Sequence, residues 1–319
     1  MSTTASDASS APRPEDPLAT LAALPGVPGA VDSVRKAVDR VYGHRVMRRR
    51  SGEVTSEAAL RAARGSAALS GADWALEEVR RRSDFGSDAE ARTVGAALRL
   101  NAEAGQLLSV WSQSPLRVLA RLHLVAAGGA GVSDRTVGRP RLAGEPVVEA
   151  PGVGAAAPAG GVTVTPSEEA SATEVPVAEV PAPVPPAGTP LPDADEVAAR
   201  LDGLARLVVT PSAAPALVTA AVVHGELLAL RPFGSYNGLV ARAAERIVLI
   251  GSGLDPKSVC PAEVGHAELG RAAYAAAFEG YVSGTPEGMA AWITHCGRAV
   301  ELGVRESTAV CEALQRGAA

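Results

Sequence analysis

The sequence contains few of the residues that cross-link or anchor a protein. Its three cysteines, Cys260, Cys296 and Cys311, form no Cys-x-x-Cys pair, so they predict neither a disulfide framework nor a zinc site. No long apolar run occurs, and no apolar stretch follows a basic N-terminus, so we expect neither a transmembrane span nor a signal peptide. A reducing cytoplasm is therefore the expected location.

Positive charge is missing from one long part of the chain. No lysine or arginine lies between Arg141 and Arg200, whereas glutamate, proline and alanine recur there. This composition buries too little apolar surface to offset the entropy lost on ordering. We predict an acidic, Pro/Ala-rich disordered insertion over residues 145–192. A disordered tail is predicted over residues 1–28, whose first seventeen residues are rich in Ser, Ala, Pro and Asp.

The net charge of −5 comes largely from this insertion. The rest of the chain is closer to neutral, which gives no general indication of nucleic-acid or membrane binding. Two blocks remain, residues 29–144 and 193–316, and nearly every segment in them has a helical pattern. Val31, Val34, Val38 and Val41 illustrate this spacing.

An all-α fold is therefore predicted, with a hairpin at 138–146 as the best candidate for any strand. The segment from Asn237 to Ile250 is apolar on most faces, so we expect it to be a central, buried helix. Gly251 and Gly253 should end it.

One loop carries most of the functional information. Residues 230–242 read Leu-Arg-Pro-Phe-Gly-Ser-Tyr-Asn-Gly-Leu-Val-Ala-Arg and connect two apolar helical patterns. Free backbone N–H groups at a helix N-terminus beside a glycine-rich turn favour phosphate binding. Gly234, Ser235, Asn237, Gly238 and Arg242 are the candidate nucleotide- or anion-binding residues.

This loop resembles the signature of the Fic (Fido) family, His-Pro-Phe-x-Asp/Glu-Gly-Asn-Gly-Arg-x-x-Arg. Five positions match, whereas Arg231, Ser235, Tyr236 and Leu239 depart from it; the matches are Pro232, Phe233, Asn237, Gly238 and Arg242. The flanks add to the resemblance, with His224 in an Ala-x-x-His-like place and residues 138–141 similar to the entry of the family's flap. The resemblance implies a Fic-type helical domain in which residues 29–144 include the flap and 193–316 form the core.

The resemblance implies an enzyme that transfers AMP from ATP to a protein hydroxyl, with Mg²⁺ as cofactor and a target chain at the flap groove. The family's base is a histidine, and here Arg231 occupies that position; a guanidinium cannot accept the proton. Ser235 replaces the carboxylate that holds Mg²⁺, and Leu239 replaces a phosphate-binding arginine. We therefore expect impaired catalysis, with binding of a nucleotide, another anion or a target chain retained at most.

A further comparison concerns the family's inhibitory helix, Ser/Thr-x-x-x-Glu-Gly/Asn, whose glutamate pairs with the second signature arginine. The run from Ser66 to Gly71 resembles it, with Ser70 in place of the glutamate. This substitution is consistent with loss of both the base and the inhibitory contact, although an unregulated enzyme would equally lack the glutamate.

Several alternatives remain open from the sequence. Arg231 is either a cation at a helix C-terminus or an anion clamp, and Arg242 pairs with a phosphate or with an internal carboxylate. His224 is a hydrogen-bonded core histidine or, less favoured, a replacement base that would keep a transferase active. A third interpretation is a protein-interaction module that needs no nucleotide.

Overall fold

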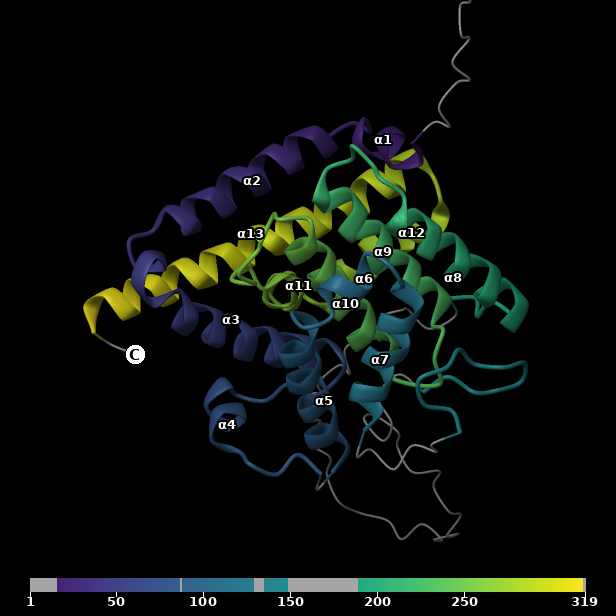
Figure 1. Ribbon diagram of the computed structural model, residues 1–319, viewed down its shortest axis with the longest axis horizontal. Coiled ribbons are helices and arrows are strands. Elements are labelled where there is room, and N and C mark those ends of the chain that lie inside the picture. Colours follow the sequence, from purple (N-terminus) through teal and green to yellow (C-terminus); the bar gives the residue numbers. More distant parts are fainter. Residues whose placement is uncertain (1–15, 87, 129–134, 149–188, 318–319) are drawn as a thin grey trace, which may run out of the picture.

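The structure is a computed structural model that describes residues 16–86, 88–128, 135–148 and 189–317 (Figure 1). These residues form thirteen helices and contain a single isolated β-bridge, so the predicted all-α class is confirmed for this part of the chain. The helices are α1 (Pro17–Ala22), α2 (Val27–Gly43), α3 (Met47–Leu69), α4 (Leu76–Arg81), α5 (Ala89–Ala104), α6 (Leu108–Trp111), α7 (Pro115–Ala127), α8 (Ala194–Val209), α9 (Ala216–Leu230), α10 (Asn237–Gly251), α11 (Ala262–Leu269), α12 (Arg271–Ser283) and α13 (Pro286–Arg316).

Helix α10 lies at the centre of the molecule. Every residue from Asn237 to Ile250 is buried, and α9, α5 and α7 pack around it. Its apolar residues occur on most faces, so only a position inside the core satisfies them. The predicted central helix is confirmed, and the chain leaves it through Gly253, which has a φ of 78°.

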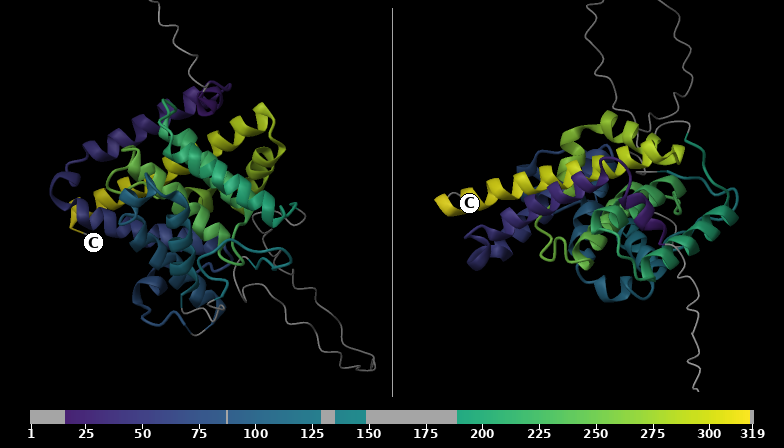
Figure 2. Two further views of the ribbon diagram at one scale, coloured as in Figure 1. Left: turned by 45° about the vertical axis from the view of Figure 1, so that its right-hand side comes forward. Right: turned by 90° about the horizontal axis from the view of Figure 1, so that it is seen from above.

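The long helix α13 forms one side of the molecule, with α2 running beside it (Figure 2). Thr285 caps its N-terminus by accepting a hydrogen bond from the backbone N–H of Gly288. Helix α13 also packs against α11 and α12, so it holds the C-terminal helices to the N-terminal α2.

The structure corrects two predictions about the irregular segments. The expected hairpin at 138–146 is absent: the segment turns back where Glu145 N donates to Leu142 O, but no backbone ladder pairs its two arms, and the chain here bonds to the motif loop. Arg141 N donates to Pro232 O (2.8 Å) and Val148 N to Gly234 O (2.8 Å). The predicted tail over 1–28 is too long, since α1 forms at Pro17–Ala22 under an Asp16 cap and Leu18 is buried.

Much of the predicted insertion, residues 149–188, lies outside the described residues. Its two ends are described, and helix α8 begins after Asp193, whose side chain accepts a hydrogen bond from Glu196 N (2.8 Å). The core predicted for residues 193–316 therefore starts at an N-terminal cap.

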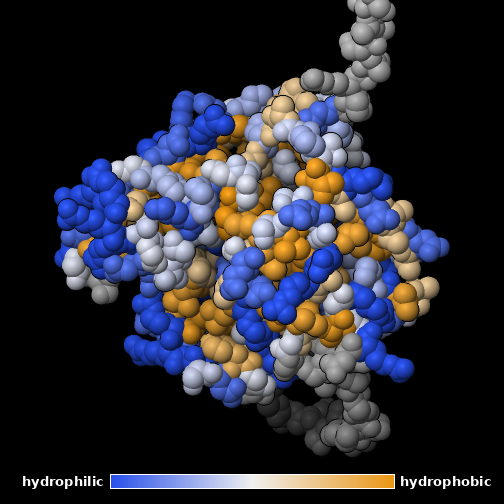
Figure 3. All heavy atoms as spheres, viewed as in Figure 1, coloured by the Kyte–Doolittle hydropathy of each residue, from blue (hydrophilic) through white to orange (hydrophobic). Residues whose placement is uncertain are grey.

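Apolar side chains are visible near the centre of the face drawn in Figure 3. A groove of about 960 Å³ is lined by residues of α1, α2, α6, α8, α9 and α10, among them Leu18, Trp111 and Leu217. None of residues 231–242 lines this groove. No helix in the described ranges has the length and apolar character needed to cross a membrane.

Candidate functional site

The motif loop, residues 231–236, connects α9 to α10 through two residues with left-handed backbone conformations. Arg231 has a φ of 42° and Tyr236 a φ of 57°. Between them the Asn237 side chain braces the loop, because its Oδ1 accepts from Phe233 N (2.9 Å) and its Nδ2 donates to Phe233 O (2.9 Å). Asn237 therefore satisfies the backbone of its own loop.

Arg231 is placed at the C-terminus of α9, where its backbone N–H donates to Leu227 O. Its guanidinium donates to two carbonyl oxygens at the end of the predicted insertion, Thr189 O (2.9 Å) and Pro190 O (2.6 Å). The position of the family's base thus holds a permanently protonated group that is bonded to the backbone.

Ser235 lies beside a histidine that the sequence analysis did not select. The Ser235 hydroxyl is 3.3 Å from His123 Nε2, and the His123 ring stacks on Phe233 with ring centroids 4.3 Å apart. His123 Nδ1 accepts a hydrogen bond from Gly138 N (3.0 Å), so a neutral ring carries its proton on Nε2 and donates it to Ser235. Burial lowers the pKa of His123 to about 4, which keeps the ring neutral at pH 7.

The position of the proton on the His123 ring decides whether the ring can act as a base toward Ser235. A base must offer a free lone pair to the hydroxyl, and the only unprotonated nitrogen of His123 already accepts from Gly138. His123 therefore positions the Ser235 hydroxyl and does not activate it.

Arg242, the second signature arginine, is directed at the end of α3. Its Nε donates to Ser66 Oγ (2.8 Å), and one terminal nitrogen donates to Ser66 O (2.9 Å) and Ser70 Oγ (2.8 Å). The run from Ser66 to Gly71, which resembles the inhibitory helix in sequence, therefore contacts Arg242. The partners are hydroxyls and a carbonyl, so the internal carboxylate considered for Arg242 is not found among the described residues.

The rest of the loop is closed by its own side chains. Tyr236 and Leu239 are 1% and 2% exposed, and Arg242 is 2% exposed. Burial of the phenol raises the pKa of Tyr236, and the nearby positive charges of Arg92 and Arg99 offset part of this rise. The Fic signature has a glycine and an arginine at these two positions, whereas here a buried tyrosine and a buried leucine occupy them.

His224 lies away from this loop as a buried core histidine. Its Nε2 is 2.5 Å from the Tyr274 hydroxyl and its Nδ1 is 2.9 Å from Glu245 Oε2, and its side chain has no exposed surface. A replacement base would need contact with a target hydroxyl, so the hydrogen-bonded core role is the one that the structure supports.

Comparison with solved structures identifies the fold. A Fic family protein from Desulfovibrio desulfuricans G20 aligns over 88% of this chain and 74% of its own length, with a TM-score of 0.60 and 16% identity. The chain has a Fic fold.

Fic-1 from C. elegans (residues 134–508) gives a second match to this Fic fold, with a TM-score of 0.57, 15% identity, and coverage of 89% of this chain and 72% of Fic-1. A single-residue variant of the same Fic-1 segment matches with a TM-score of 0.55 and 15% identity, covering 88% of this chain and 72% of the variant. No family model matches the sequence, and no curated protein does. The likeness to these Fic proteins is therefore one of fold, at 15 to 16% sequence identity.

The Fic fold brings most of the selected residues together. Ser235, Asn237 and Arg242 all lie at the start of α10 and are buried. Arg231 lies at the other end of the loop. His123 was missed because it comes from α7, more than one hundred residues before the motif, and its spacing carries no signal for the contact.

Proposed function

We propose that this protein is a Fic-fold protein that binds the phosphate of a nucleotide at Arg242 and does not transfer AMP through the family's base. The observation that carries the proposal is the set of partners around Arg242. A buried guanidinium is ordinarily paired with a carboxylate or another anion. Arg242 is held by the hydroxyls of Ser66, Ser70 and Tyr274 and by one carbonyl oxygen, all of them neutral.

A neighbour on the same helix illustrates the difference. Arg246, one turn further along α10, donates to both carboxylate oxygens of Glu263, at 2.9 and 2.7 Å. Its charge is therefore neutralised inside the protein. Arg242 keeps its charge next to the N-terminus of α10, where the helix dipole also favours an anion.

The resemblance to the Fic family suggests that this anion is a nucleotide phosphate. The absence of a base argues against transfer, because Arg231 cannot accept a proton and His123 has its unprotonated nitrogen occupied. The residues also do not fit Mg²⁺. The position of the metal-binding carboxylate holds Ser235, whose hydroxyl is bonded to His123.

In the conformation described here the site is closed. Ser70 is half-buried over Arg242 and Tyr236 fills the loop, so a phosphate must displace at least the Ser70 hydroxyl. Such a displacement exchanges a hydrogen bond to a neutral hydroxyl for one to an anion, in which both partners are charged and the guanidinium can bind two oxygens at once.

Thermal unfolding with ATP, ADP and inorganic phosphate, each with and without Mg²⁺, tests this proposal. We expect a nucleotide to raise the melting temperature without requiring Mg²⁺. The Arg242→Ala variant should lose the rise, and Ser70→Glu should lose it too, because the new carboxylate would take the guanidinium. Tyr236→Gly should enlarge the rise, since glycine tolerates the φ of 57° and clears the loop.

Ser56→Glu is the matched control, because it adds the same charge to an exposed position of α3 and should respond like the wild type. A wild-type protein that shows no shift with any of these anions would overturn the proposal. So would an Arg242→Ala variant that keeps the full shift. Incubation with α-labelled ATP and a cell lysate tests whether the protein transfers AMP. Labelled protein would contradict the proposed loss of transfer.

A further inference from the structure

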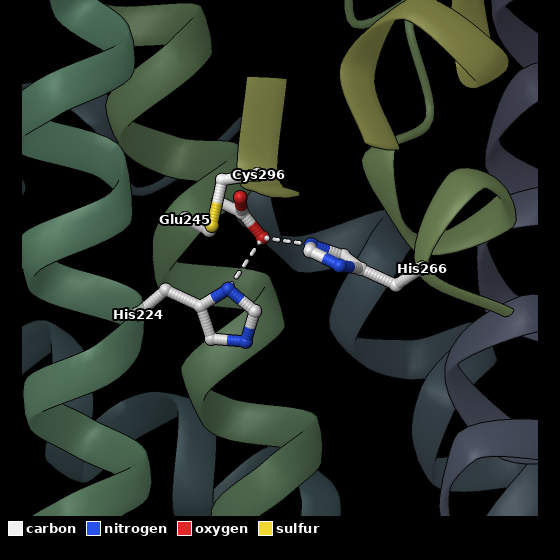
Figure 4. A group of neighbouring side chains, drawn as sticks. All are labelled: His224, Glu245, His266 and Cys296. Atoms are coloured by element: carbon white, nitrogen blue, oxygen red, sulfur yellow. Dashed lines mark hydrogen bonds and ion pairs between the residues drawn. The ribbon is translucent and has the colours of Figure 1, made fainter. Parts of the chain in front are cut away.

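A second group of polar side chains lies deep in the core, apart from the motif loop (Figure 4). It consists of His224 from α9, Glu245 from α10, His266 from α11 and Cys296 from α13. Each offers one donor atom, and these four atoms all lie within 4.8 Å of one another. We call these residues the core cluster; Figure 4 shows all four side chains converging on one point.

The spacing inside the core cluster is close to that of a metal site. His224 Nδ1 and His266 Nε2 lie 2.9 and 3.3 Å from the same oxygen, Glu245 Oε2. Ligand atoms on a tetrahedral zinc ion with bonds of about 2.1 to 2.3 Å are separated by about 3.4 to 3.7 Å. Small movements of the side chains therefore bring the four atoms onto one ion.

Hydrogen bonds within the described residues do not satisfy every polar atom of the core cluster. Among the described residues, the buried Glu245 Oε1 has no hydrogen-bond partner. His224 Nδ1 is close to Glu245 Oε2, but the two atoms are not aligned as a hydrogen bond. An unsatisfied buried carboxylate oxygen is costly. A cation between the four side chains would bind His224 Nδ1, and coordination by both carboxylate oxygens of Glu245 would also satisfy Oε1.

The ring nitrogens that face away from Glu245 are already in use. His224 Nε2 lies 2.5 Å from the Tyr274 hydroxyl, and His266 Nδ1 lies 3.2 Å from His295 Nε2. Metal-binding histidines usually bond the second nitrogen in this way, which fixes the tautomer and aims the first nitrogen at the ion. Both histidines therefore have the orientation expected of ligands.

The types of the four ligand atoms and their burial indicate which metal ion the core cluster would bind. One thiolate, one carboxylate and two neutral imidazoles balance the charge of a dication, and sulfur with nitrogen favours zinc over Mg²⁺ or Ca²⁺. The four side chains are at most 1% exposed. With four protein ligands and no open position, such a site is structural and not catalytic.

We propose that His224, Glu245, His266 and Cys296 bind one structural zinc ion that ties α9, α10, α11 and α13 together. Because the core cluster is buried, the ion enters as the chain folds. The proposal does not depend on the nucleotide site, since none of its ligands belongs to the motif loop.

The test starts from the full chain, produced in zinc-supplemented medium and analysed for metal content. We expect about one zinc ion per chain, and a lower melting temperature after unfolding and refolding with a chelator. Refolding with Co²⁺ should give a thiolate-to-cobalt charge-transfer band. The Cys296→Ala variant should lose the band and most of the metal.

Cys311→Ala is the matched control, because Cys311 is also buried in α13 but lies outside the core cluster, and it should keep both signals. A wild-type chain that holds neither zinc nor cobalt after refolding would overturn the proposal. Full metal retention by Cys296→Ala would also overturn it. Should that variant fail to fold, the wild-type cobalt spectrum decides, since only a thiolate ligand produces the band.

Discussion

His123 and Ser235 form a contact in which a histidine donates to a serine. The direction of this hydrogen bond follows from the backbone, because Gly138 N–H occupies Nδ1 and leaves the proton on Nε2. The same contact explains why the low pKa of His123 does not make it a base. The lowered pKa keeps the His123 ring neutral. The lone pair of the neutral ring is on Nδ1, where it accepts from Gly138 N, and not on Nε2, which faces Ser235.

The pKa of His123 leads to a prediction about acid stability. Its value of about 4 in the folded chain is below the usual value of 6.5, so the unfolded chain takes up the proton first as the pH falls. Between pH 7 and 5 this group should remove about 2 kcal/mol from the free energy of unfolding, and the loss should level off near pH 4. Urea titrations across this range should show a smaller loss for His123→Gln than for the wild type.

Ser235→Ala separates this effect from loss of the contact, because it removes the hydroxyl and leaves the histidine. Its stability should fall with pH as steeply as that of the wild type. Equal slopes for the wild type and His123→Gln would contradict the assignment.

Part of the site could be predicted from the sequence and part could not. The loop residues were found because they are contiguous, and Arg242 and Ser70 were linked through a resemblance to two separate motifs. His123 was missed, and the members of the core cluster were not linked to one another, because these residues come from different helices. Cys296, for example, lies fifty-one residues after Glu245, and no short spacing marks it as a ligand.

Helix α11 is held between α3 and α13 by close contacts at glycines. A side chain at Gly265 would place its Cβ 1.9 Å from Ala299 O of α13, and one at Gly65 would lie 2.7 Å from Glu263 O of α11. Both obstacles are backbone atoms, which cannot move independently of their helices. These glycines therefore set the distances between the three helices.

Gly265→Ala should consequently destabilise the protein by at least about 2 kcal/mol, the scale of overpacking in a rigid core. Urea unfolding measures the change. Gly52→Ala in α3 is the matched control, because nothing lies within 4 Å of its Cβ, and it should be neutral or stabilising by up to about 1 kcal/mol. A Gly265→Ala variant as stable as Gly52→Ala would show that α11 can shift away from α13.

The helices themselves were predictable, but their contacts were not. Periodicity placed α10 and its burial correctly, since an apolar pattern on most faces has one physical solution. The hairpin was wrong because the segment at 138–146 pairs with a loop almost one hundred residues away. Turn residues predict where the chain changes direction. Which segment the backbone then hydrogen-bonds to depends on contacts that form only in the folded molecule.

The motif loop is contacted by the residues on both sides of the segment 149–188. Val148 N donates to Gly234 O on one side, and Thr189 O accepts from the Arg231 guanidinium on the other. Residues 148 and 189 therefore both contact the same short loop, and the two ends of the segment between them are held near each other.

This arrangement predicts that residues 149–188 can be replaced by a flexible linker of about ten residues without loss of the fold. The shorter loop should raise the free energy of unfolding by about 1 kcal/mol, since closing it costs less entropy. Chemical denaturation of the shortened and full-length proteins tests this expectation. A large loss of stability would show that the replaced segment contributes its own contacts to the domain.

Leu239 occupies a position that cannot take a charged side chain without a loss of stability. It is 2% exposed and lines a small space with Leu100, Ala243 and Arg246, whose carboxylate partner Glu263 is already bonded through both oxygens. An arginine at this position would bury a second charge without a partner of its own. The core would have to repack around a Leu239→Arg substitution before the new guanidinium could bind an anion, so this position limits the chemistry of the loop through folding and not through reactivity.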